Sequence, residues 1–315
     1  MKARHDDFFE DYIRSFTFNL ENIWKESSAR ELTKSHNKKI QNSAIVIGRG
    51  PSLKKNHQLE LLAASNYKGS IVCCDGILPD ALKAGVTPIK FPKYYVVTID
   101  PFPATENFYR PSIVKKYGSK IKGIFSTVTS PSVVQRARLA GIKIHWIHSL
   151  YDYNEGKKSF NNISALMVRA KNHNHGLPAI QTGGNAGTSS WFVSWQILKC
   201  TTVALIGINH GWEVDDSLET ILSHTFLNEK SLKKFYNQNG IKKKYQKLFP
   251  RIYNPEYKKY CISDPLFQFY RNALIEFIRR SPYNITTINA TEGGSIFGKR
   301  IICTSLKEFL KQYKR

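Results

Sequence analysis

Short apolar segments alternate with segments of helical length over residues 43–208. The apolar segments lie at 43–47, 70–74, 94–99, 121–126, 142–147 and 202–208. Because they are almost continuously apolar, they are typical of parallel strands that are covered on both faces. The segments of helical length lie at 54–65, 78–85, 131–140 and 187–199. This alternation predicts right-handed βαβ units and a doubly wound, mostly parallel sheet in an α/β fold.

Both ends of the chain depart from this pattern. Apolar residues recur at helical spacing over 6–33, which predicts one or two helices, and the polar residues 34–42 predict a linker. Residues 211–262 are polar, basic and rich in tyrosine, so we expect helices and loops that cap the sheet. The remaining predicted elements are a helix, a strand and a final helix at 264–280, 284–290 and 304–314.

Composition narrows the class of protein. The chain has 315 residues, of which 41% are hydrophobic, enough for a full core, so wholesale disorder is excluded. No uncharged apolar run approaches the roughly 18 residues of a membrane-spanning helix, and the start turns acidic at Asp6 where a secretory signal would be apolar. Five cysteines without paired spacing argue against a disulfide framework or a zinc site, so we predict no metal and a cytoplasmic location.

The charge balance points to anionic partners. There are 47 Lys and Arg against 24 Asp and Glu, a net charge of +23. Residues 231–260 are strongly basic, with Glu256 as their one acidic residue. We expect this segment to dock on the anionic inner membrane surface or a polyanionic acceptor, with a solvated lysine-rich face as the alternative. No recognised nucleic-acid module accompanies the charge, so no specific nucleic acid is predicted.

The chemistry is expected at the carboxyl ends of the strands, where open α/β sheets bind ligands. The first predicted strand is followed by Gly48-Arg49-Gly50-Pro51-Ser52-Leu53. The glycines allow a tight turn, and Ser52 is expected to cap a helix that starts near Lys54 and offers its amides to a phosphate. The third glycine of a dinucleotide fingerprint is absent, and a plain turn without ligand is the alternative.

Carboxylates follow the next two predicted strands, in Asp75-Gly76 and in Asp100-Pro101. A carboxylate at each of two adjacent strand ends could hold a ribose hydroxyl or a metal-bound phosphate. The alternative is turn formation or helix capping, since Asp-Gly and Asp-Pro are common turn pairs.

A polar, glycine-rich segment precedes the predicted helix 187–199. Its candidate nucleotide-binding residues are Thr182, Gly183, Gly184, Asn185, Gly187 and Thr188. This composition indicates a second anion-binding helix N-terminus. A side chain added at Gly50 or Gly184 is expected to obstruct the ligand and leave the fold largely intact.

Three titratable residues are candidates for acid–base work. The strand 202–208 is followed by Asn209 and His210, whose imidazole would titrate beside a phosphate. His224 would approach the same edge if its loop folds back, and Glu292 lies in a glycine-bearing turn after the last strand. A structural histidine or a plain loop is the alternative for each.

Taken in order, these motifs resemble the 6-hydroxymethylpterin diphosphokinase MptE-like domain family, a Rossmann-like group. The elements are Gly48-x-Gly50-Pro51-Ser52-Leu53, Asp75-Gly76, Thr98-Ile-Asp100-Pro101, Thr182-Gly183-Gly184-Asn185-x-Gly187, Gly207-Ile-Asn209-His210 and Asn289-Ala-Thr-Glu-Gly-Gly294. The first turn is also similar to that of bacterial sialyltransferases. The resemblance covers about 43–304.

The residue patterns and the resemblance together predict a domain organisation. A helical N-terminal segment over 1–40 would precede a Rossmann-like nucleotide-binding domain over 41–315. Within that domain, residues 211–280 would form a basic, mainly helical insertion or cap.

The family includes two chemistries. Motility accessory factor (Maf) glycosyltransferases are thought to transfer nonulosonic (sialic- or pseudaminic-type) sugars from CMP donors, whereas the pterin pyrophosphokinases use ATP and Mg²⁺. The pyrophosphokinases carry an Asp-Leu-Asp type cluster, where this chain has Asp100 alone, and a His-rich motif that His173-Asn-His175 matches only in outline. We therefore favour the glycosyltransferase, which requires no cofactor. The alternatives are a Mg²⁺-dependent pyrophosphokinase and a non-catalytic nucleotide- or polyanion-binding protein.

The favoured resemblance implies roles for the candidate residues. The turns at 48–52 and 183–188 would cradle the nucleotide, and Asp75 or Asp100 would lie near the ribose. His210, His224 or Glu292 would be the general base.

Overall fold

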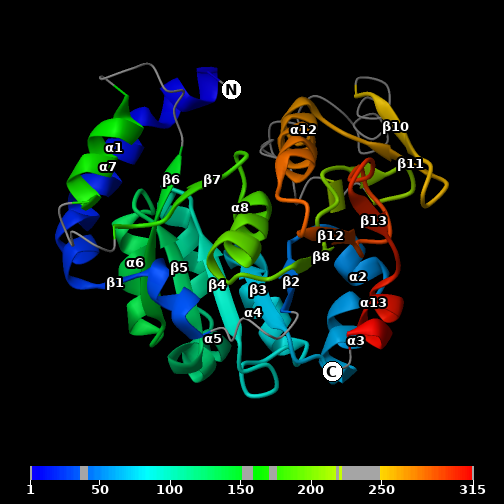
Figure 1. The fold of residues 1–315 in the computed structure, drawn as a ribbon, viewed down its shortest axis with the longest axis horizontal. Helices are drawn as coiled ribbons and strands as arrows, with labels where there is room; N and C mark the ends of the chain where they lie inside the picture. The colour runs from blue at the N-terminus through cyan, green and yellow to red at the C-terminus, as the bar shows by residue number, and fades with distance from the viewer. Residues whose placement is uncertain are drawn as a thin grey trace.

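The computed structural model describes residues 2–35, 42–150, 159–169, 176–217, 220–221 and 249–313. Within them, a ten-stranded sheet forms the centre of the fold (Figure 1). Its strand order is β1 (Ser27–Ser28), β6 (Lys143–Leu150), β5 (Lys122–Ser126), β4 (Tyr94–Thr98), β3 (Ser70–Cys74), β2 (Ser43–Ile47), β8 (Thr202–Ile206), β12 (Thr286–Asn289) and β13 (Ile301–Cys303), with β7 (Ala179–Gln181) beside β6. The paired strands of this sheet run parallel, as predicted.

The continuous apolar runs are explained by two cores, one on each face of the sheet. In β2, Ile45 and Ile47 belong to one hydrophobic cluster, and Ala44 and Val46 belong to the other. Because successive side chains of a strand point to opposite faces, a strand covered on both sides needs apolar residues throughout.

Helices cover both faces of the sheet. The α-helices are α1 (Lys2–Lys25), α2 (Ser52–Lys55), α3 (Gln58–Ala64), α4 (Leu78–Lys83), α5 (Ser112–Tyr117), α6 (Pro131–Leu139), α7 (Phe160–Arg169), α8 (Ala186–Phe192), α12 (Pro265–Arg280) and α13 (Leu306–Gln312). Helix α8 continues as a π-helical turn over Val193–Ile197, and 3-10 segments lie at Ala29–Ser35, Asp75–Ile77, Pro103–Tyr109 and Gly118–Lys120. The predicted helix 54–65 is divided into α2 and α3 at His57, whose φ of 48° is left-handed.

The topology creates a switch point between β2 and β8. From β2 the chain winds outward through β3, β4, β5 and β6, and then returns to place β8 on the other side of β2. At such a point the connections leave the sheet in opposite directions, which opens a crevice at the carboxyl ends of the strands.

The two terminal regions lie at opposite ends of the sheet in Figure 1. Helix α1 confirms the predicted N-terminal helix and packs beside α7, and the side chain of Asn19 donates to the carbonyls of Thr127 and Thr129 at 3.2 and 2.7 Å. None of the described helices is long and apolar enough to cross a bilayer.

The cap differs from the helices and loops expected over 211–262. Its described residues form an antiparallel sheet of β9 (Trp212–Glu213), β10 (Arg251–Asn254) and β11 (Lys259–Ile262). The Asn254 side chain closes the β10–β11 turn by accepting from the amide of Glu256 at 3.0 Å, and Tyr253 pairs with Tyr260 across the hairpin. Residues 222–248 lie outside the described part.

Candidate functional site

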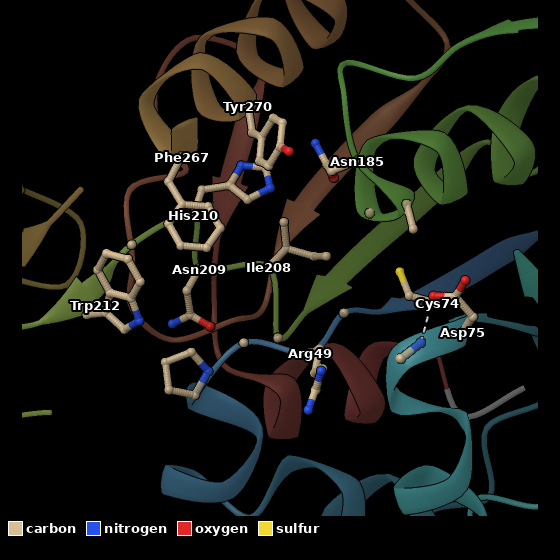
Figure 2. Close-up of a pocket in the computed structure, with 18 of the residues that line it drawn as sticks. Arg49, Cys74, Asp75, Asn185, Ile208, Asn209, His210, Trp212, Phe267 and Tyr270 are labelled. Atoms are coloured by element: carbon tan, nitrogen blue, oxygen red, sulfur yellow. Dashed lines mark hydrogen bonds between the residues drawn. The ribbon is translucent and has the colours of Figure 1, made fainter. Parts of the chain in front are cut away.

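A cavity of about 260 Å³ lies at the switch point. Its lining comprises Gly48–Pro51, Cys74–Gly76, Phe108, Asn185–Gly187, Gly207–Trp212, Phe267 and Tyr270. Figure 2 shows Arg49 and Asp75 on one side and His210, Phe267 and Tyr270 on the other. We name the first group the polar wall (Arg49, Asp75). The second group, together with the lining residue Trp212, is the aromatic wall (His210, Trp212, Phe267, Tyr270).

The backbone after β2 lies so close to the end of β8 that Gly48 and Gly50 cannot carry a side chain. The amides of Gly48 and Gly50 donate to the carbonyls of Ile206 and Gly207 at 2.9 and 2.7 Å. A Cβ on Gly50 would lie 2.1 Å from Oδ1 of Asn209. These two amides are therefore engaged within the protein, and a phosphate cannot use them without breaking these bonds.

Ser52 positions Asn209 instead of capping a later helix. Helix α2 begins at Ser52 itself, after Pro51, and no side chain caps it. The Ser52 hydroxyl donates to Oδ1 of Asn209 at 2.9 Å. The expectation of a Ser52 cap near Lys54 is wrong, because the hydroxyl finds a partner at the end of β8.

Asp75 is the acidic residue of the lining within the described chain. Its side chain is 6% exposed, Oδ1 accepts from the Gly76 amide at 2.7 Å, and Oδ2 has no hydrogen-bond partner. Burial and the charge of Asp100 raise the pKa of Asp75 to about 7, although the Gly76 amide, the nearby Thr98 hydroxyl and the charge of Arg49 act to lower it. Asp100 is near enough to act electrostatically but is outside the lining.

Arg49 is a functional candidate that the sequence reasoning missed. Its exposed guanidinium lies 5.5 Å from the centre of the Phe108 ring, at the polar wall. A positive charge there can bind a phosphate. The signal was present, since Arg49 stands between the two glycines of the first turn.

The glycine-rich turn before α8 is organised by its own side chains. Asn185 caps the helix by accepting from the Thr188 amide at 2.9 Å, and Thr182 accepts from the Gly184 amide at 3.2 Å. Asn185 and Gly187 line the cavity, whereas the other candidates of this turn are not part of the lining: Thr182, Gly183, Gly184 and Thr188. A Cβ on Gly184 would lie 2.7 Å from the Tyr270 ring, so this glycine is needed for packing.

His210 reaches the cavity as predicted. Its ring is stacked with that of Phe267 at a centroid distance of 6.3 Å and tilted against that of Tyr270 at 6.0 Å, and Nδ1 is buried without a partner. Burial and the charge of Arg271 lower the pKa of His210 to about 3. The imidazole is therefore neutral near pH 7, and it is better suited to hydrogen bonding than to accepting a proton. Its φ of 43° is also strained for a non-glycine residue.

Glu292, the other base candidate within the described residues, is not in the cavity lining. Oε1 of Glu292 accepts from the Leu306 amide at 3.1 Å and from the Gln58 side chain at 3.3 Å, so it anchors the start of α13. His224, the pair His173 and His175, and residues 231–248 of the basic segment lie outside the described residues.

An ion-pair cluster, absent from the predictions, fastens the cap to α2. Nζ of Lys55 lies 2.6 Å from Glu213 and 3.0 Å from Asp215. Burial lowers the pKa of Lys55, but the hydrogen bonds to these carboxylates outweigh it, so the pKa is raised overall. No group of three or more His, Cys, Asp or Glu in the described chain is arranged to hold a metal ion.

Known proteins share this fold and sequence pattern. The family model described as 6-hydroxymethylpterin diphosphokinase MptE-like matches residues 14–215. A solved structure of the Maf glycosyltransferase from Magnetospirillum magneticum AMB-1 aligns with 94% of this chain at a TM-score of 0.56 and 13% identity, which shows a shared fold. The chain spans 41% of that protein. No curated protein sequence matches the chain.

Proposed function

This chain belongs to the 6-hydroxymethylpterin diphosphokinase MptE-like family, and we propose that it is a transferase whose substrate carries a nucleotide. The observation that carries the proposal is the pairing of two unlike walls around one cavity at the switch point. Arg49 offers charge for a phosphate, and the aromatic wall offers flat surfaces on which a base can stack. Sheets of this topology bind nucleotides at this point.

We propose more specifically that it is a glycosyltransferase with a CMP-activated nonulosonic sugar as donor. A phosphate leaving group needs little more than stabilisation of its charge, which Arg49 and the first turn of α8 can supply. Asp75 is the one carboxylate lining the described cavity, whereas phosphoryl transfer generally uses several ligands to hold Mg²⁺. The named activity of the Maf structural neighbour supports this choice.

The dimensions of the cavity suit part of such a donor. Pockets for drug-sized ligands usually enclose about 300–1,000 Å³, and this cavity of about 260 Å³ is slightly smaller. We propose that the nucleoside lies along the aromatic wall and the phosphate near Arg49. The sugar would then face the acceptor near the polar wall.

A pterin pyrophosphokinase is the second candidate. It is favoured by the electrostatic coupling of Asp75 with Asp100, since two carboxylates on adjacent strand ends can share a Mg²⁺ ion. Asp75 and Asp100 would hold such an ion, and its positive charge would favour phosphoryl transfer.

The deciding experiment measures binding and turnover in parallel. Calorimetry without Mg²⁺ should detect the binding of CMP and of a CMP-nonulosonate. The release of CMP from the CMP-nonulosonate should persist in EDTA. AMP formation from ATP and a hydroxymethylpterin, dependent on Mg²⁺ and without turnover of any CMP-sugar, would contradict the glycosyltransferase and favour the second candidate. Failure to bind any nucleotide would remove both.

A further inference from the structure

The side chain of Asn209 is fixed at its oxygen end. This residue follows β8, lines the cavity and is 4% exposed. Its Oδ1 accepts from the hydroxyl of Ser52 at 2.9 Å and, more weakly, from the Ser52 amide at 3.5 Å. Because the two N–H donors of a side-chain amide lie opposite its accepting oxygen, Ser52 determines which way these donors face.

The nitrogen end of this amide has no acceptor within the described residues. In this part of the chain, the hydrogen bonds of the Asn209 side chain all involve Oδ1. Figure 2 shows the amide between Arg49 and Trp212, with its nitrogen on the side of Trp212. Buried polar groups are nearly always paired, so an open donor in the wall of a cavity indicates a ligand that supplies the acceptor.

The amide nitrogen lies beside the part of the cavity where the base is proposed to stack. His210 directly follows Asn209, and Trp212 packs against Phe267 with ring centroids 5.0 Å apart. The oxygen end of the amide contacts the first turn, where a Cβ on Gly50 would lie 2.1 Å from Oδ1. Nδ2 is therefore placed to meet the base of a nucleotide and not its phosphate.

We propose that Asn209 selects the base of the nucleotide by donating from Nδ2 to the 2-carbonyl of cytosine, an assignment that rests on the proposed function. Cytosine has one carbonyl, at C2, whereas adenine has none and offers only ring nitrogens as acceptors. Ser52 is a positioning residue, because its hydroxyl keeps Oδ1 turned away from the ligand. A base without a carbonyl leaves Nδ2 unsatisfied, and an unmade hydrogen bond at a buried donor weakens binding.

The first test compares the binding of CMP and of uncharged cytidine by calorimetry. Asn209→Asp keeps the shape of the side chain but replaces the donor with an acceptor, so both ligands should bind about ten- to a hundredfold more weakly. Ser52→Ala should weaken both by less, since the amide can then rotate, and its addition to Asn209→Asp should cause no further loss. Asn272→Asp adds the same charge at an exposed position outside the lining and should leave both affinities unchanged.

A second test needs no variant, so it does not depend on the folding of one. 2-Thiocytidine carries sulfur, a weak hydrogen-bond acceptor, in place of the oxygen at C2. The wild type should bind it roughly fivefold or more weakly than cytidine, and it should bind AMP about tenfold more weakly than CMP.

Three results would overturn the assignment. Two of them are equal affinities of the wild type for cytidine and 2-thiocytidine, or for CMP and AMP. The third is an Asn209→Asp variant that loses affinity for CMP but keeps it for cytidine, because the donor would then meet the phosphate. A wild type that binds no nucleotide would instead overturn the proposed function and this assignment with it.

Discussion

The polar and aromatic walls enclose the same cavity, yet burial has opposite consequences for the titratable group of each. It raises the pKa of Asp75 to about 7 and lowers the pKa of His210 to about 3. In both cases low-dielectric surroundings disfavour the charged form. An acid with this shift comes to titrate near neutral pH, whereas a histidine is moved away from it. Of these two groups, only the Asp75 carboxyl therefore changes its charge near neutral pH.

The largest expected effect comes from crowding the contact between the ends of β2 and β8, from which the residues Arg49 and His210 of the two walls extend. Gly50→Ala should lower the free energy of unfolding by about 3 kcal/mol or more, because its Cβ meets Oδ1 of Asn209 at 2.1 Å and the carbonyl of Gly207 at 2.6 Å. Gly76→Ala is the matched control, since its Cβ meets only flexible or distant side-chain atoms, the nearest being Cδ of Arg49 at 3.3 Å. Urea unfolding measures both. Equal stability of the two variants would show that the β2 and β8 ends are not in contact as described.

The next effect is the pH dependence of stability, which should differ in sign between Asp75 of the polar wall and His210 of the aromatic wall. The usual pKa of an aspartate, 3.8, is raised to about 7 in folded Asp75, so the folded state holds more protons between these values and stability falls as pH rises through them. Asp75→Asn removes this cost and should be more stable than the wild type above pH 7, by an upper limit of roughly 4 kcal/mol.

The titration of His210 should change the free energy of unfolding with pH in the opposite direction. Its folded pKa is depressed, so the unfolded state binds the extra proton and stability falls as pH drops below about 6.5. His210→Gln should lessen that loss. Denaturant unfolding from pH 4 to 9 gives both curves, and parallel curves for the wild type and Asp75→Asn would contradict the difference between the walls.

The smallest expected effects concern nucleotide affinity. Tyr270→Ala should weaken CMP and cytidine about equally, by about 1–3 kcal/mol, if the base stacks on the aromatic wall. Arg49→Ala should weaken CMP about tenfold, mainly at low salt, and leave cytidine unchanged, because the exposed guanidinium acts on the phosphate. Calorimetric titrations distinguish them, and a loss of cytidine affinity in Arg49→Ala would reverse the proposed orientation of the nucleotide.

The sheet and part of the site followed from local sequence patterns. The runs that became β2, β3, β4 and β8 were recognised because two-sided burial leaves no polar position within a strand. The rule for strand ends then placed Gly48, Asp75, Asn209 and His210 at one edge, and all four line the cavity. The short strands β1, β7 and β13 were missed, since two or three residues carry no pattern.

Roles failed where the partner of a side chain is distant in sequence. Ser52 had the right surroundings for a helix cap, but its hydroxyl donates to Asn209 instead. Glu292 stays a predicted base, although its Oε1 accepts from the amide of Leu306. The helix predicted over 264–280 was given no part in the site, yet the packing of α12 brings Tyr270 to the cavity. In the cap, β11 likewise pairs with β9, which is far away in the chain, and β10 pairs with β11.

The sequence by itself determined which segments become strands, which residues follow them and which family the motifs resemble, because periodicity and turn chemistry act over a few residues. Only the tertiary structure decided that Asp75 is buried near Asp100 and that His210 is enclosed by aromatic rings. Burial and neighbouring charge set the proton affinity of a group, and both arise from segments that meet only when the chain is folded.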